Sequence, residues 1–273
     1  MFVEILSHVA VTGAFEAYGH SSELKKTWQK TLHYIKHGKL AIIVIGAGGV
    51  GKSTLAKFLA NPTNKIPPRE YSESFHVELC KLPGGAVAEL ITAPGQARHH
   101  DSWDTLFENA KSAGKKFGII HVTSFGYHST NIDIKALREG NETSNTTTLR
   151  YLGDCRRKEI EIANDLCARL KKHNLPIWMI SLVAKQDLWW NEKNIVEKHY
   201  KEGDYFKAVA SLAVAHTVPG FRHEYFSVAL HSQNFSDGSG TLIHPTTGGY
   251  DDAIKYSHQE KLLSMINGFV GIN

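Results

Sequence analysis

The 273-residue sequence has few cysteines, no block of like charge and no long apolar run, and each absence excludes a class of protein. Its three cysteines, Cys80, Cys155 and Cys167, form no C-x-x-C pair and cannot all be paired within the chain, which favours a reducing, cytoplasmic setting. The 31 basic residues are spread among 27 acidic ones, so we expect no nucleic-acid partner. Because no stretch has the apolar length of a membrane span and the first residues do not read as a signal peptide, we expect a soluble protein.

Apolar segments that read as strands alternate with helical patterns along most of the chain. Strands are predicted at residues 40–45, 75–82, 86–91, 117–122, 176–183 and 224–230. Pro83-Gly84-Gly85 lies between the second and third of these segments, as a hairpin turn would, so these two strands are expected to be antiparallel. The sequence therefore predicts an α/β fold with three layers, in which helices cover both faces of a mostly parallel sheet with one antiparallel strand.

The chain is predicted to consist of an N-terminal helical extension, residues 1–38, and one main domain, residues 39–273. Within the extension, residues 22–37 form an amphipathic helix with one apolar face made of Leu24, Trp28, Leu32 and Ile35. Packing of this face on the domain is favoured, and peripheral contact of the lysine-rich helix with an anionic membrane is the alternative.

A long polar segment interrupts the alternation of the main domain at residues 125–154, before a helix that is expected to start near Cys155. Most connections in compact domains are far shorter. The Ser/Thr/Asn-rich composition favours a solvated surface insertion, and a lid or a partner-binding element is the alternative.

A glycine-rich turn, "IGAGGVGKST" at residues 45–54, follows the first predicted strand and precedes a helical segment. It satisfies the pattern G-x-x-x-x-G-K-[ST] in the strand–turn–helix context that a phosphate-binding P-loop requires. Glycines let backbone N–H groups turn inward as an anion nest, the lysine can reach the β- and γ-phosphates, and the serine hydroxyl can coordinate Mg²⁺. The predicted nucleotide-binding residues here are Gly46, Gly48, Gly49, Val50, Gly51, Lys52, Ser53 and Thr54, with Ser53 as a Mg²⁺ ligand.

The choice of base rests on "AKQD", residues 184–187, at the end of a buried-looking strand. A carboxylate at Asp187 can accept from both N1–H and the 2-amino group of guanine, whereas adenine offers no such donor pair, and the Lys185 stem can lie over the ring. The segment resembles the [NT]-K-x-D signature of the Ras-like superfamily of P-loop GTPases. Ala184 replaces the Asn or Thr of that family, so we expect one hydrogen bond that braces the loop in the family to be absent here.

Two further segments extend the resemblance. Thr92-Ala93-Pro94-Gly95-Gln96 is similar to the T-x-P-G-Q of bacterial gliding-motility-type GTPases, which implies that Gly95 contacts the γ-phosphate and Gln96 orients the attacking water. The "FHVE" of "REYSESFHVEL" is similar to the corresponding stretch of ADP-ribosylation-factor-like GTPases, which implies Ser72, with Ser74 as the competing choice, as a second Mg²⁺ ligand. Since Thr92 stands where Ras-like proteins carry aspartate, Mg²⁺ affinity and resting hydrolysis are expected to be low.

The resemblance implies a GTP-binding protein that hydrolyses GTP slowly, with Lys52 and Gln96 as catalytic residues, Mg²⁺ as cofactor, and a protein effector or activating partner. A P-loop ATPase or kinase, or a nucleotide-binding scaffold with little hydrolysis, is the alternative. An ATPase would need a hydrophobic strand that ends in aspartate, which neither "IIHVTS" nor "LITAPG" supplies. The sixteen histidines lack metal-ligand spacing, and Trp189 and Trp190 are compatible with a partner anchor, a nucleotide-stacking wall or internal packing.

Overall fold

The computed structural model describes residues 40–60, 62, 78–81, 87–92, 101–112, 116–172, 176, 178–215, 221–237, 240–244 and 247–270. The predicted N-terminal extension, residues 1–38, lies outside the described residues, as do Ser72, Gly95 and Gln96. Within the described ranges, no helix has the length and apolar character needed to cross a membrane.

A six-stranded sheet contains all six predicted strands. Its order is β2 (Glu78–Lys81), β3 (Val87–Thr92), β1 (Leu40–Gly46), β4 (Lys116–Thr123), β6 (Trp178–Val183) and β7 (Arg222–Ser227). Every neighbouring pair is parallel except β2 with β3, which is antiparallel. The prediction of a mostly parallel sheet with one antiparallel strand is confirmed.

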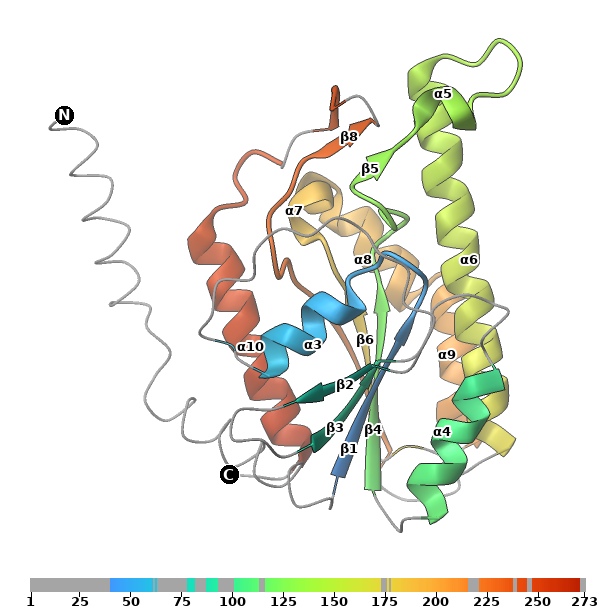
Figure 1. Cartoon of the computed structure of the whole chain (residues 1–273), viewed down its shortest axis with the longest axis vertical. Helices are drawn as coiled ribbons and strands as arrows, with labels where there is room; N and C mark the ends of the chain where they lie inside the picture. Colours follow the sequence, from blue (N-terminus) through green and yellow to red (C-terminus); the bar gives the residue numbers. More distant parts are fainter. Residues whose placement is uncertain are drawn as a thin grey trace, which may run out of the picture.

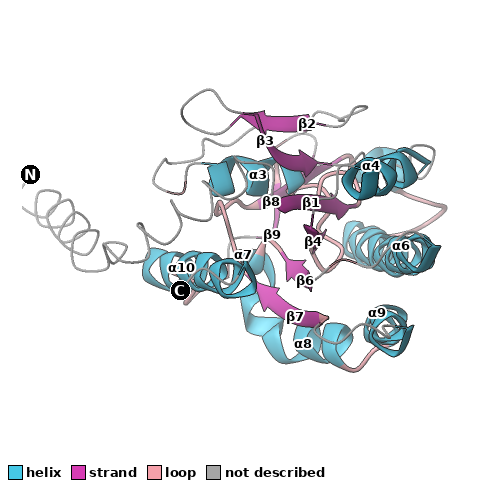
Figure 2. Ribbon diagram, turned by 90° about the horizontal axis from the view of Figure 1, so that it is seen from below, coloured by secondary structure: helices cyan, strands magenta, loops and turns pink. Residues whose placement is uncertain are grey.

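Helices cover both faces of this sheet, as Figure 2 shows when the sheet is seen end-on. One face carries α3 (Lys52–Ala60) and α10 (Asp252–Val270), and the other carries α4 (Asp101–Ser112), α6 (Ser144–Lys172) and α9 (Asp204–Ala215). Residues 41–45 of β1 are fully buried, because a central strand between two helical layers has no solvent-facing side. The structure thus confirms the three-layer α/β fold.

A second, smaller sheet was not predicted from the sequence. It consists of β5 (Asn131–Ile132), β8 (Phe235–Asp237) and β9 (Leu242–His244), with β8 in the middle. Strands of two or three residues are too short to show the alternation from which strands are recognised. This sheet joins the segment after β4 to the segment after β7 (Figure 1).

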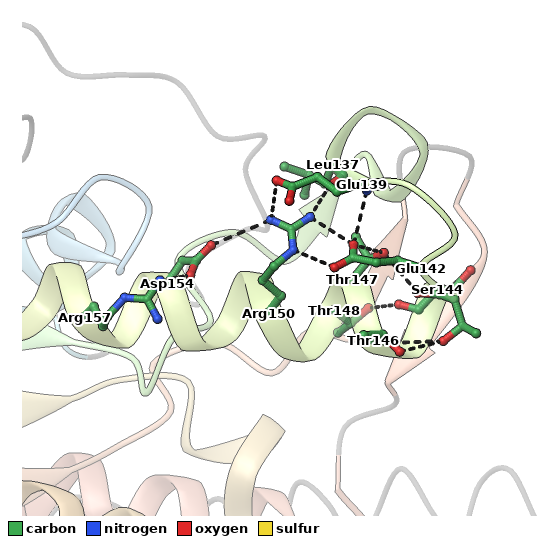
Figure 3. Close-up of polar contacts among 11 residues, drawn as sticks. Leu137, Glu139, Glu142, Ser144, Thr146, Thr147, Thr148, Arg150, Asp154 and Arg157 are labelled. Atoms are coloured by element: carbon green, nitrogen blue, oxygen red, sulfur yellow. Dashed lines mark hydrogen bonds and ion pairs between the residues drawn. The ribbon is translucent and has the colours of Figure 1, made fainter.

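The polar segment 125–154 is largely organised, and the predicted start of its following helix is wrong. After the short helix α5 (Ile134–Leu137), helix α6 begins at Ser144 and not near Cys155. Arg150 stabilises this first part of α6, since it donates to Glu142 at 2.9 and 3.0 Å and to the Leu137 carbonyl at 2.5 Å (Figure 3). A run of Ser, Thr and Asn has poor intrinsic helix propensity, so contacts across the bend decide its conformation.

The carboxyl-terminal side of the sheet leads into three short helical elements and α10. Helices α7 (Gln186–Trp189), η2 (Trp190–Glu192) and α8 (Lys193–Lys201) follow β6 directly. Helix α8 continues into α9 through a turn at Gly203, and the two helices pack on each other. The terminal helix α10 spans 19 residues.

Candidate functional site

The site predicted from the sequence is built by loops that leave the carboxyl ends of β1, β4 and β6. These strands are parallel and in register, with Gly46 beside Val122 and Val122 beside Leu182, so the loops meet at one edge of the sheet. The chain passes from β1 to β2 and β3 on one side and then to β4 on the other, which makes this edge a topological switch point. Open α/β sheets bind ligands at such points.

Three glycines of the P-loop sequence, Gly46, Gly49 and Gly51, occupy positions that other residues could not adopt without strain. A Cβ on Gly46 would lie 2.1 Å from the carbonyl oxygen of Val122, and Gly49 and Gly51 have φ angles of 78° and 104°. Val50, between them, is fully buried and anchors the loop in the core. Positive φ values of this kind are typical of backbone nests that bind anions.

Lys52, Ser53 and Thr54 form the first turn of α3 directly after this loop. Lys52 is 8% exposed, and its Nζ donates a 2.7 Å hydrogen bond to the carbonyl of Ala47 within the same loop. The helix amino terminus adds a positive dipole end to the lysine charge. Loop, ammonium group and helix terminus together form an environment suited to phosphate.

Lys185 joins the glycine-rich loop to the loops after β4 and β6. Its Nζ uses all three donors, on the carbonyls of Gly49 at 2.9 Å, Tyr127 at 2.5 Å and His128 at 3.1 Å. Burial lowers the pKa of Lys185 to about 8, although the neighbouring Asp187 carboxylate opposes this change. The three carbonyls are the structural reason why the ammonium group is tolerated inside the protein.

Asp187 is buried, at 1% exposure, in the first turn of α7. Its Oδ2 accepts a 3.0 Å hydrogen bond from the backbone N–H of Gln233, whereas no described residue donates to the buried Oδ1. Burial raises the pKa of Asp187 to about 6, against the hydrogen bond from Gln233. A buried carboxylate oxygen that lacks a donor is costly, and each such group in a native structure requires an explanation, of which a role in ligand binding is one.

The side chain of Gln186 holds the loop after β6 in place, close to Ala184, whose side chain forms no hydrogen bond. Its Nε2 donates to Ser227 Oγ at 2.8 Å, and its Oε1 accepts from Tyr250 Oη at 3.1 Å and His258 Nδ1 at 2.6 Å. The loop after β6 is thereby tied to the end of β7 and to α10.

Neither of the two tryptophans after Asp187 is free to serve as an exposed anchor. Trp189 is buried and donates from Nε1 to the Ala184 carbonyl at 3.0 Å. Trp190 packs against Tyr250 and His258, with ring centroids 5.3 and 5.9 Å away. Of the three interpretations open from the sequence, these contacts favour internal packing.

Among the described residues, no group of three or more His, Cys, Asp or Glu side chains could hold a metal ion. Of the two predicted Mg²⁺ ligands, Ser53 is described and lies partly buried at the start of α3. Thr92 ends β3 beside Val44 of β1, so β3 ends at the same edge of the sheet as the P-loop, and the rest of the predicted segment 92–96 lies outside the described residues.

Sequence reasoning missed Glu159, a buried acid on α6 that contacts the turn whose carbonyls hold Lys185. A signal was present in the sequence, because Glu159 lies at helical spacing within the apolar face formed by Leu152, Cys155, Ile162 and Leu166. A charged residue in such a stripe must find partners in the interior.

No protein-family model and no curated protein sequence matches this chain. Among solved structures, it is similar to the mammalian SRP receptor, with 13% sequence identity and a TM-score of 0.40 over 84% of this chain and 99% of that one. It is also similar to a dimerization-deficient mutant of Toc33 from Arabidopsis thaliana, with 9% identity and a TM-score of 0.40 over 92% of this chain and 93% of that one.

Proposed function

We propose that this protein binds guanine nucleotides with Mg²⁺, hydrolyses GTP slowly and acts as a nucleotide-dependent switch. The observation that carries the proposal is the buried Asp187 carboxylate, which keeps one oxygen without a donor among the described residues. It lies two residues beyond Lys185, whose ammonium group contacts the P-loop at Gly49. A base read by Asp187 therefore belongs to a ligand whose phosphates lie on that loop.

Guanine fits the hydrogen-bonding capacity of Asp187. Both donors of the guanine edge, N1–H and the 2-amino group, can be accepted by one carboxylate, and adenine lacks this pair. Oδ2 already accepts the Gln233 N–H and can accept a second hydrogen bond, so guanine can be recognised while this contact is kept. The Gln233 contact links the base site to the segment before β8.

The phosphate end of the site is proposed to follow the P-loop pattern. Lys52 turns from the Ala47 carbonyl to the β- and γ-phosphates, and Ser53 holds Mg²⁺ together with Ser72. A bound Mg²⁺ supplies positive charge that screens the phosphates during transfer. The hydroxyl of Ser53 at the start of α3 is a suitable hard oxygen ligand.

Slow hydrolysis is proposed from the segment 92–96, by the resemblance described for Gly95 and Gln96. Water positioned by Gln96 alone leaves most of the transition-state charge without a partner, so hydrolysis waits for an activating protein. Gln96→Leu should lower the single-turnover rate, and an unchanged rate would assign water positioning to another residue.

The base assignment is tested by titrating wild type and Asp187→Asn with GTP, ATP and xanthosine triphosphate. Each charge-assisted hydrogen bond lost contributes about 1.5 to 3 kcal/mol, so the variant should bind GTP roughly a hundredfold more weakly or worse. Its amide N–H₂ can donate to the 2-carbonyl of xanthine, so affinity for xanthosine triphosphate should rise. Unchanged GTP affinity, or preference of wild type for ATP, would overturn the guanine assignment in favour of an ATPase or kinase.

A further inference from the structure

A buried polar cluster around Glu159 links α6 and α8 to the turn at residues 124–128, which follows β4. Glu159 is 1% exposed, and its Oε1 accepts from Ser124 N at 2.9 Å, Gly126 N at 3.2 Å and His128 Nε2 at 3.1 Å. Its Oε2 accepts from Tyr200 Oη at 2.5 Å. A carboxylate that leaves water must be compensated in this way, and four donors satisfy it.

The turn itself depends on this support. Phe125 and Gly126 both have positive φ angles, 53° and 91°, and the left-handed region is unfavourable for a phenylalanine. The hydroxyl of Tyr200, which donates to Glu159, accepts the N–H of Phe125 at 3.0 Å. Glu159 and Tyr200 thus hold three successive backbone N–H groups of a strained segment.

The charges in the cluster support one another. Burial alone would lower the pKa of His128, but its hydrogen bonds to Cys155 and Glu159 raise that pKa to about 9. Burial would likewise raise the pKa of Glu159, yet the hydrogen bond and charge of His128 hold it below its usual range. Glu159 and His128 therefore form a buried ion pair at neutral pH.

The opposite side of the same turn faces the nucleotide site. Its carbonyls at Tyr127 and His128 accept two of the three hydrogen bonds of Lys185, and the third goes to Gly49 in the P-loop. Any shift of the turn moves two of the three acceptors that fix the Lys185 ammonium group. The chain of contacts runs from Tyr200 and Glu159 through the turn to Lys185 and the P-loop.

We infer that Glu159 is a positioning residue for nucleotide binding, acting through the 124–128 turn and Lys185 on the P-loop. This inference deepens the proposed function and rests on it where nucleotide is the ligand. Glu159 does not touch the ligand. It holds the turn whose carbonyls place Lys185, so that the P-loop is already formed when nucleotide arrives.

The first test needs no nucleotide and compares amide hydrogen exchange in Glu159→Gln with that in Tyr205→Phe. Glutamine keeps the volume and one acceptor but removes the charge that holds His128. Tyr205 is a matched control, since its buried hydroxyl bonds to Ser181 and His121 and not to the turn. Faster exchange in both the turn and residues 47–51 is expected for Glu159→Gln alone. Equal exchange of the P-loop in the two variants would overturn the inference.

The second test is a double-mutant cycle on GDP affinity with Glu159→Gln and Lys185→Met. In the wild-type background, Glu159→Gln should lower the affinity for GDP about tenfold. In the Lys185→Met background, the same substitution should lower the affinity less than about twofold, because the residue through which Glu159 acts is already gone. Additive losses would show that Glu159 acts otherwise and would overturn the inference. If Glu159→Gln does not fold, Tyr200→Phe takes its place in the same cycle with the same criterion. Failure of wild type to bind GDP would count against the proposed function, whereas the exchange test would still decide the role of Glu159.

Discussion

Asp187→Asn should stabilise the nucleotide-free protein while it abolishes tight GTP binding. The carboxylate is buried, one of its oxygens lacks a donor among the described residues, and burial raises its pKa to about 6. A group kept for ligand recognition is expected to cost stability in the absence of the ligand. Removal of its charge should therefore recover part of that cost.

The size of the expected stabilisation follows from the difference between the pKa of Asp187, about 6, and the ordinary value of 3.8. At about 1.4 kcal/mol per pH unit, the ionised Asp187 costs the fold about 3 kcal/mol above pH 6. Asparagine still accepts from the Gln233 N–H but buries an amide nitrogen, at a cost of about 1 to 2 kcal/mol if that nitrogen finds no acceptor. The net expectation is a gain of about 1 to 2 kcal/mol, or roughly 2 to 8 °C in Tm.

The pH dependence identifies the source of the gain. Because the folded-state pKa of Asp187 is raised, the folded protein binds a proton between about pH 4 and 6 that the unfolded chain does not. The destabilisation by the ionised Asp187 is therefore complete above pH 6 and decreases on acidification. Urea unfolding at pH 8 and at pH 5 should show the advantage of the variant shrinking at the lower pH. Glu161→Gln, at an exposed position of α6, is the control and should leave the free energy of unfolding unchanged at both pH 8 and pH 5. A variant clearly less stable than wild type at pH 8 would refute the reasoning, because Asp187 would then be a structural anchor.

Three other substitutions test separate parts of the site and its surroundings. Lys52→Ala should abolish measurable GTP binding in calorimetry with a near-native circular dichroism spectrum, and retained affinity would contradict the P-loop assignment. Gly46→Ala should lower the free energy of unfolding by about 2 kcal/mol or more in urea, since its Cβ would lie 2.1 Å from the Val122 carbonyl oxygen. Arg150→Met should speed amide exchange over residues 137–147 without a change in GDP affinity, because Arg150 holds the Glu142 segment and not the P-loop. A weaker GDP affinity would assign this region a role in binding.

Local patterns in the sequence were sufficient to predict the main sheet and the glycine-rich loop. The buried strands β1, β4 and β6 are largely apolar, and short apolar runs of this kind are typical of parallel strands covered on both faces. The P-loop is likewise a local feature, because its conformation depends on glycines at fixed positions such as Gly46 and Gly51.

Contacts between distant segments decided the rest, and no local pattern contains them. Helix α6 begins at Ser144 through the Arg150 contacts, and the β5–β8 pairing joins segments about a hundred residues apart, as the pair Asn131 and Ser236 shows. Only the tertiary structure places Glu159 under the turn at 124–128 and the Gln233 N–H on Asp187, across 46 residues of chain. Sequence determined which groups are available for chemistry, whereas burial and long-range hydrogen bonds decided which of them are charged, held or left without a partner.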